Sequence, residues 1–138
     1  MIYLASPYSH DDPAVMEQRF HDVCKVTAQL IKAGLNVFSP IAHSHPLVEY
    51  GAPTDWKSWE RVDLDILGRC DGIAVLELEG FSASVGVHAE VKFAKSIGMK
   101  VMRFSPLDPM EQVAEEWEGL FNTAMDGAME MGSAGGLM

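Results

Sequence analysis

The sequence is poor in cysteine: Cys24 and Cys70 are the only two, and they form no CxxC spacing. No secretory leader precedes the segment "MIYLAS", and no apolar run is long enough to cross a bilayer. These absences favour a soluble cytoplasmic protein that has free thiols and no membrane partner.

Basic residues are also scarce. Ten Lys and Arg residues stand against 20 Asp and Glu residues, the formal net charge is -10 at pH 7, and no run of basic residues forms a stripe. We therefore do not expect the chain to bind a nucleic acid through its phosphates. A small anionic ligand is still compatible with an acidic surface, because a helix end or a backbone nest binds an anion locally.

The chain does contain enough apolar residues for a core. Its 138 residues are 48% hydrophobic, which fits one compact domain. We expect this domain to cover residues 1–123. Residues 124–138 are rich in Gly and Met and are expected to form a flexible C-terminal tail.

Apolar runs alternate with segments of helical period. The runs at 1–6, 35–40, 71–78 and 100–105 predict buried strands, and helices are predicted between them and after the last one. Residues 41–55 are expected to form a long loop. This alternation predicts an α/β fold: a single-domain, Rossmann-like three-layer sandwich with a four- or five-stranded parallel sheet. Ligands bind such folds at the carboxyl ends of the strands, here at loops 6–13, 40–55 and 79–88.

The segment "GFSASVGVHAE", residues 80–90, joins a predicted strand to a predicted helix. Ser82, Ser84 and Gly86 lie just before or at the helix start, where unpaired N–H groups and the helix dipole favour an anion. Small side chains also let a ligand approach the backbone. The alternative is a simple capped helix start, since Ser is a good N-cap.

Two carboxylates stand out by their place on predicted helices. Glu90 is expected to point towards the site, and its alternative is an exposed Glu that favours the helix dipole. Asp63 lies at the edge of an apolar face, whereas Asp65 lies on the solvent side. Asp is rare beside a buried face without a partner, although an Asp that accepts a backbone N–H is an alternative. That apolar face consists of Trp59, Val62, Ile66, Leu67 and Cys70.

Two histidines, His43 and His45, occur in the segment "HSH" and suggest a metal pair. His10 or His88 is a candidate third ligand, but the spacing is not diagnostic of zinc. We therefore expect loop packing or substrate contacts from these side chains, and no metal. The sequence also has no GxGxxG, P-loop or GxSxG motif, so no cofactor is expected.

Three of these segments together resemble the nucleoside 2-deoxyribosyltransferase superfamily: "IYLAS", "DLDILGRCD" and "SVGVHAE". The resemblance covers residues 1–104. With "SPIAHSHPL" and the Trp-rich helix, it is closest to a bacterial and phage family of uncharacterised function. The resemblance implies that Glu90 is a nucleophile for the anomeric carbon of a (deoxy)ribosyl group. It also implies that Asp63 helps to protonate the leaving base and that Tyr3 is an active-site residue.

The position of Ser84 separates two branches of this superfamily. Deoxyribosyltransferases have an Asp there, whereas nucleoside 5'-monophosphate N-hydrolases have a Ser and then a Gly that bind phosphate; Ser84 and Gly86 resemble the hydrolases. The hydrolases also have a phosphate-directed Arg in the first loop, where this chain has Ser9. Arg19, on the following helix, is a candidate substitute.

The sequence therefore predicts an N-glycosidase of a (deoxy)nucleoside 5'-monophosphate. Glu90, near a helix N-terminus, is expected to stay ionised, and Asp63 to be protonated more readily. Ser6, Ser9 and His45 are expected to add contacts to the substrate or its phosphate. The alternatives are a deoxyribosyltransferase, a non-catalytic nucleotide-binding protein and a metal-dependent hydrolase. A dimer or tetramer is expected, with the helix that carries Trp56 and Trp59 and the last helix as candidate interfaces.

Overall fold

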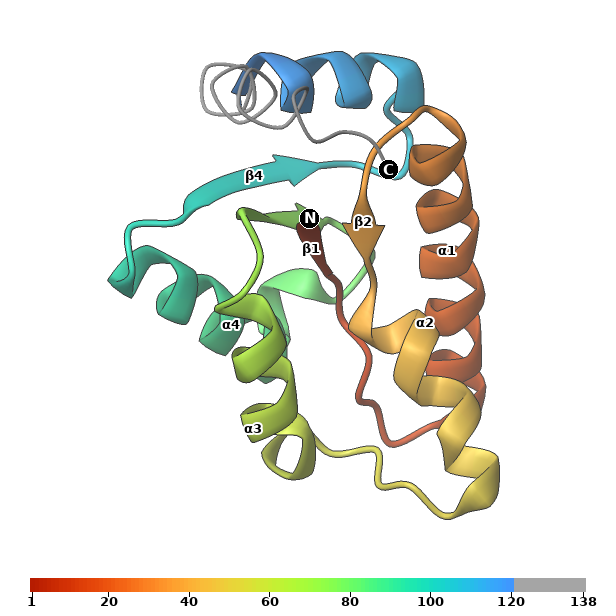
Figure 1. The fold of residues 1–138 in the computed structure, drawn as a ribbon. Helices are drawn as coiled ribbons and strands as arrows, with labels where there is room; N and C mark the ends of the chain where they lie inside the picture. Colours follow the sequence, from red (N-terminus) through yellow and green to blue (C-terminus); the bar gives the residue numbers. More distant parts are fainter. Residues whose placement is uncertain (121–138) are drawn as a thin grey trace.

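A four-stranded parallel sheet organises the chain, of which the computed structural model describes residues 1–120 (Figure 1). The strands are β1 (Ile2–Ala5), β2 (Val37–Phe38), β3 (Gly72–Leu76) and β4 (Lys100–Phe104), in the spatial order β2-β1-β3-β4. The predicted α/β fold with a parallel sheet is confirmed. The expected domain end at residue 123 and the expected tail at 124–138 lie outside the described residues.

Three long helices connect the strands, and each begins at a side-chain cap. They are α1 (Pro13–Lys32), α3 (Trp56–Leu67) and α4 (Val85–Ser96), and residues 110–120 form a further helix. Asp12, Asp55 and Ser84 are the N-caps, and each side chain accepts a backbone N–H of the first turn. None of the helices within residues 1–120 is long and apolar enough to cross a membrane.

The expectation of a loop over residues 41–55 is wrong in part. Helix α2 (Pro40–Ser44) and the 3-10 helix η1 (His45–Tyr50) occupy most of it. Ser39 caps α2 through Ala42 N–H, and Pro40 stands at its first turn, the same start signal that opens α1. Gly51, with φ of 98°, ends η1.

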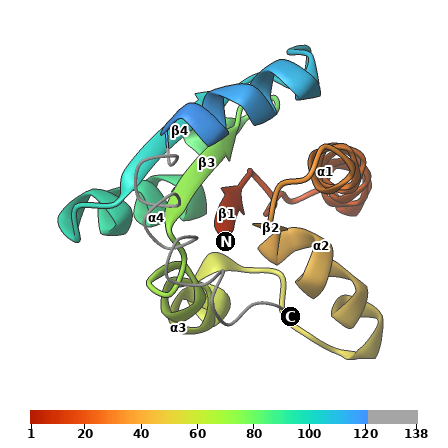
Figure 2. The same ribbon diagram turned by 45° about the horizontal axis from the view of Figure 1, so that its top comes forward.

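Alternate residues of β1 point to opposite faces of the sheet, because side chains alternate along a strand. Ile2 and Leu4 pack in the core formed with α1 and helix 110–120. Tyr3 and Ala5 pack in the core formed with α3 and α4 (Figure 2). These two cores are the two interfaces of the predicted three-layer sandwich.

The order of the strands reverses between β1 and β3. The chain runs from β1 through α1 to β2 on one side and later returns through α3 to β3 on the other. The loops that leave β1 and β3 therefore diverge at the carboxyl edge of the sheet and leave a crevice between them.

The side chain of Arg19 holds these two loops together. Its Nη1 donates to the carbonyls of Tyr8 (3.3 Å) and Ser9 (3.0 Å), and its Nη2 donates to the carbonyl of Glu79 (3.4 Å). Gly80, with φ of 93°, lies against this guanidinium, and a Cβ at Gly80 would stand 2.4 Å from Nη2. Arg19 is therefore a structural clamp between the loop after β1 and the loop after β3.

The contacts of Arg19 predict that alanine substitution at two glycines with similar positive φ lowers the free energy of unfolding by different amounts. Gly51→Ala meets no atom within 4 Å, so it should cost only the left-handed backbone strain, about 1–2 kcal/mol. Gly80→Ala carries the same strain and must also displace Arg19, so it should cost at least about 1 kcal/mol more. Urea unfolding of both variants measures the difference, and equal costs would contradict the clamp.

Candidate active site

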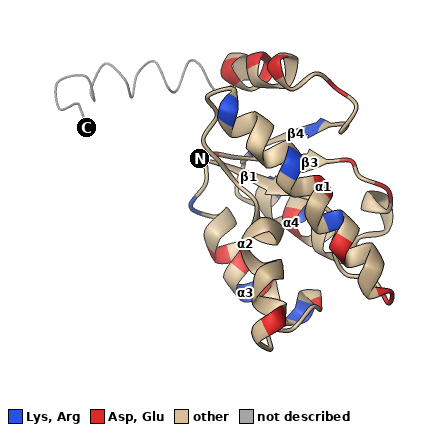
Figure 3. Ribbon diagram, turned by 90° about the vertical axis from the view of Figure 1, so that its right-hand side faces the viewer, with Lys and Arg blue, Asp and Glu red and all other residues tan. Residues whose placement is uncertain are grey.

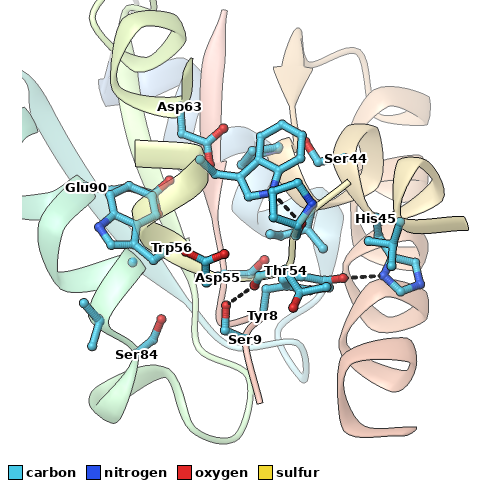
Figure 4. A pocket seen from close by; sticks show the side chains of 18 of the residues that line it. Tyr8, Ser9, Ser44, His45, Thr54, Asp55, Trp56, Asp63, Ser84 and Glu90 are labelled. Atoms are coloured by element: carbon cyan, nitrogen blue, oxygen red, sulfur yellow. Dashed lines mark hydrogen bonds between the residues drawn. The ribbon is translucent and has the colours of Figure 1, made fainter. Parts of the chain in front are cut away.

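A cavity of about 180 Å³ lies at the carboxyl ends of β1, β2 and β3 (Figure 4). Its wall comes from the loop after β1, from α2 and η1, from the start of α3 and from the start of α4. The residues that line it include Ser6, Tyr8, Ser9, His45, Trp56, Trp59, Asp63, Ser84, Gly86 and Glu90.

Two carboxylates are buried in this wall. Glu90 of α4 is 4% exposed, and Asp63 of α3 is 7% exposed. The Tyr3 hydroxyl, which is fully buried in β1, donates a hydrogen bond to Glu90 Oε2. The structure thus brings the three predicted catalytic residues together, and the alternative of a solvent-exposed Glu90 is wrong.

Burial changes the acidity of all three groups. Desolvation raises the pKa of Asp63 to about 6. It raises the pKa of Glu90 to about 8; the hydrogen bond from Tyr3 lowers this value and the charge of Asp63 raises it. Desolvation, followed by the charges of Glu90 and Asp63, raises the pKa of Tyr3 far above its ordinary value. Near neutral pH the pair therefore retains one proton, and the higher pKa of Glu90 favours that proton on Glu90.

The expectation that Glu90 stays ionised is accordingly wrong for the empty site. A helix dipole stabilises a nearby anion by about 0.3–1 kcal/mol and fades beyond the first turn. Glu90 lies in the second turn of α4, which begins at Val85. Loss of hydration in a fully buried site outweighs so small an effect.

Ser84 and Gly86, the predicted phosphate-binding residues, lie at the N-terminus of α4. The Ser84 side chain accepts the N–H of Val87 at 3.2 Å, so the capping role of this residue is confirmed. Its hydroxyl hydrogen is not used in that bond. A Cβ at Gly86 would stand 3.1 Å from Cε3 of Trp56, which gives this glycine a packing role beneath the indole ring.

Two serines of the first loop differ in what they bond. The Ser6 hydroxyl is buried in the cavity wall without a hydrogen-bond partner in the part of the chain that is described. Such an orphaned group marks a place where a ligand atom or a water binds. Ser9 donates to the carbonyl of Thr54 at 2.6 Å, and the Trp59 indole N–H donates to the carbonyl of Pro53 at 2.7 Å. Ser9 thus helps to hold the segment before α3 in place.

His45 lines the cavity, but both of its ring nitrogens are already engaged. Nδ1 lies 2.7 Å from the Tyr8 hydroxyl, and Nε2 lies 3.1 Å from Glu17 Oε2. The ring also packs on Phe20, with 4.4 Å between ring centroids. Tyr8 is a site residue that the sequence did not single out, although it lies in a loop that was expected at the site.

The other histidines considered as metal ligands do not join His45. His43 packs beside Phe38, with 6.0 Å between ring centroids, and its Nδ1 lies 3.2 Å from Ser44 Oγ. His10 Nδ1 accepts the N–H of Asp12, and His88 Nε2 donates to the carbonyl of Ser82. Within residues 1–120, no three His, Cys, Asp or Glu side chains are grouped as metal ligands would be.

The cavity wall is acidic. It contains Asp55, Asp63 and Glu90, and none of the described residues that line it is Lys or Arg. Arg19 is not among them, because its N–H groups are bound to backbone carbonyls. Figure 3 shows the basic residues scattered over separate elements of the ribbon and a concentration of acidic residues on helix 110–120. The groups of this wall that can bind an anion are therefore neutral hydrogen-bond donors.

Comparison with protein-family models identifies the family of this chain. A family model described as "Domain of unknown function (DUF1937)" matches residues 1–106, a range that includes all the site residues above. A search of curated proteins found no match.

The raised pKa of Glu90 predicts a pH-dependent stability. Its ordinary pKa is 4.5 and its folded pKa about 8, so the folded protein binds this proton more strongly than the unfolded chain. The stability it contributes is fully present below about pH 4.5 and is lost as pH rises through about 8. The Tm should therefore fall between these values, and Glu90→Gln should reduce that fall. Thermal unfolding at a series of pH values measures it, with the exposed Glu111→Gln as control; an unchanged slope in Glu90→Gln would refute the assignment.

Proposed function

The chain belongs to the DUF1937 family, and we propose that it is an N-glycosidase that cleaves the base–sugar bond of a (deoxy)nucleoside 5'-monophosphate. The observation that carries the proposal is the buried pair of Glu90 and Asp63, with Tyr3 bonded to Glu90, in the wall of a cavity at the strand-order switch. Glycosidic cleavage uses two carboxylates in unlike environments, one as nucleophile and one as acid. The resemblance to the deoxyribosyltransferase superfamily supports the same assignment.

In the first step, the Glu90 carboxylate attacks the anomeric carbon and the carbon–nitrogen bond to the base breaks. The bonding electrons leave with the base, which takes a proton from Asp63. Positive charge develops on the sugar beside Glu90 as the bond breaks, and this charge favours the ionised form of Glu90. The mechanism therefore requires that the bound substrate reverses the order of the two pKa values, so that Asp63 holds the proton and Glu90 is ionised before the base leaves.

In the second step, water attacks the anomeric carbon of the glycosyl ester and releases Glu90 as a carboxylate. Asp63, now ionised, accepts the proton of that water, so the sum of the two steps is nucleotide plus water to free base plus sugar phosphate. Tyr3 donates to Glu90 Oε2 and stabilises this carboxylate whenever it is ionised.

The phosphate would lie at the start of α4. The hydroxyl of Ser84 has a free hydrogen, and the first N–H groups of the twelve-residue helix have no intrahelical partner. The cavity, at about 180 Å³, is below the range of about 300–1,000 Å³ typical of ligand sites, so it suits the sugar or base and not the whole nucleotide. Trp56 and Trp59 offer aromatic faces for a base.

Release of free base from nucleotides is the direct test of the proposed function. Wild-type protein incubated with a panel of ribo- and deoxynucleotides, including modified pyrimidines, should liberate free base, measured by liquid chromatography. Glu90→Ala should lower kcat/KM at least about 1,000-fold through loss of the nucleophile. Asp63→Asn should lower it at least about 100-fold, whereas Asp65→Asn, on the exposed face of the same helix, should not.

The panel also separates the alternatives. Ligand-induced thermal stabilisation without any base release would identify a nucleotide-binding protein instead. A new nucleoside formed when a second free base is added would identify a transferase. Absence of both base release and binding across the panel would refute the proposal.

Ser84 gives a separate test of the phosphate. Ser84→Asp keeps a good N-cap and so the helix start, but it places a negative charge where the phosphate is proposed. The KM for nucleotides should rise at least about 10-fold, while the KM for nucleosides and the Tm should change little. An equal change for both substrate types would place the phosphate elsewhere.

A further inference from the structure

Three side chains from separate elements form a hydrogen-bonded chain that ends at the cavity, on the side opposite to Glu90 (Figure 4). Glu17 belongs to α1, His45 begins η1, and Tyr8 lies in the loop after β1. We infer that Glu17 and His45 are positioning residues that make the Tyr8 hydroxyl a hydrogen-bond acceptor in the cavity, so that the site selects a substrate with a donor group there. This inference deepens the proposed function and rests on it.

The direction of the chain follows from what each group can do. Glu17, as a carboxylate, can only accept, so Nε2 of His45 carries the hydrogen and donates across the 3.1 Å contact. Nδ1 of the neutral imidazole then has only a lone pair, and the Tyr8 hydroxyl must donate to it across 2.7 Å. The Tyr8 oxygen is left with lone pairs alone to offer to a ligand.

The packing keeps His45 in this orientation. Its ring lies between the ring of Phe20, at 4.4 Å, and the edge of the Tyr8 ring, at 5.5 Å between centroids. The side chain of His45 is only 15% exposed. Glu17 Oε2 also lies 3.4 Å from His21 Nε2, one turn further along α1, so a second imidazole group faces the same carboxylate.

Three other residues of the wall are also acceptors, whereas the hydroxyls of Ser6 and Ser84 keep a hydrogen to donate. Asp63 and Glu90 have carboxylate oxygens that accept hydrogen bonds. The Ser9 hydroxyl already donates its hydrogen to the carbonyl of Thr54. A ligand that satisfies these groups and Tyr8 must bring hydrogen-bond donors. In a nucleotide the donors are sugar hydroxyls, exocyclic base amines and the ring N–H groups of oxo bases. The inference assigns Tyr8 to a sugar hydroxyl or to an exocyclic amine.

The tautomer of His45 tests the proposed directions of these hydrogen bonds without any substrate. Long-range ¹⁵N–¹H NMR at about pH 8.5, above the ordinary range for imidazole, should show His45 with its hydrogen on Nε2. The His45 signal is identified by its loss in His45→Gln. Glu17→Gln can donate to the ring as well as accept from it, so this variant should show a substantial Nδ1–H population. A wild-type ring with its hydrogen on Nδ1, or no change in Glu17→Gln, would overturn the inference.

Substrate preference tests whether the Tyr8 hydroxyl selects a substrate that carries a hydrogen-bond donor. Wild-type kcat/KM should favour the donor-bearing member by about 10-fold in one of two matched comparisons: ribo- against deoxynucleotides, or amino against oxo bases on the same sugar. Tyr8→Phe should reduce that ratio to within about 3-fold, and Glu17→Gln should reduce it partly although Tyr8 is intact. Tyr50→Phe, at a position that is 83% exposed, should leave it unchanged. Ratios unaffected by Tyr8→Phe in both comparisons would refute the role of Tyr8.

The two proposals fail in different ways. If no nucleotide is cleaved, the same ligand pairs are compared by their dissociation constants in calorimetry, which do not require catalysis. A preference that disappears in Tyr8→Phe supports the inference even then. Equal affinities in wild type and Tyr8→Phe for every pair would overturn it, whatever the outcome of the base-release assay.

Discussion

The burial of two carboxylates against one tyrosine is the constraint on which the site depends. Removing Glu90 and Asp63 from water costs several kcal/mol for each charge. Two effects limit this cost: the raised pKa values keep a proton on the pair near neutral pH, and the Tyr3 hydroxyl donates to Glu90. The hydrogen bond to Glu90 also explains why β1 contains the hydroxyl of Tyr3, although the other residues of this strand are apolar.

The loops around the cavity are held by contacts that occupy the N–H groups of Arg19 and the hydroxyl of Ser9. Arg19 binds three backbone carbonyls and joins the loops after β1 and β3. Ser9 and Trp59 bind the carbonyls of Thr54 and Pro53 before α3. A wall without Lys or Arg among its described residues follows from this use of Arg19. Recognition of an anion would therefore depend on helix N–H groups and serine hydroxyls, and recognition of neutral groups on oriented acceptors such as Tyr8.

Sequence reasoning succeeded where local chemistry decides structure and failed where burial does. The strands and the starts of α1, α3 and α4 were predictable from apolar runs and from capping residues. The Ser39–Pro40 start of α2 was missed because the polar composition of the segment favoured a loop. Val62, expected on the buried face of α3, is 46% exposed, because that face turns towards the sheet through Asp63 and Leu67. The ionisation of Glu90 was predicted from the helix dipole, which is weak beside desolvation.

The sequence by itself determined the order and type of the strands and of the long helices, since periodicity and caps act over a few residues. It also placed Asp63 and Glu90 on helix faces that look towards a core. Only the tertiary structure decided their partners. Tyr3 meets Glu90 across 87 residues and Tyr8 meets His45 across 37, because the crossovers of the parallel sheet bring distant loops to one edge. The acidity of the pair and the direction of the Tyr8 hydrogen bond are properties of that packing, because both depend on groups that are neighbours in space and not in the chain.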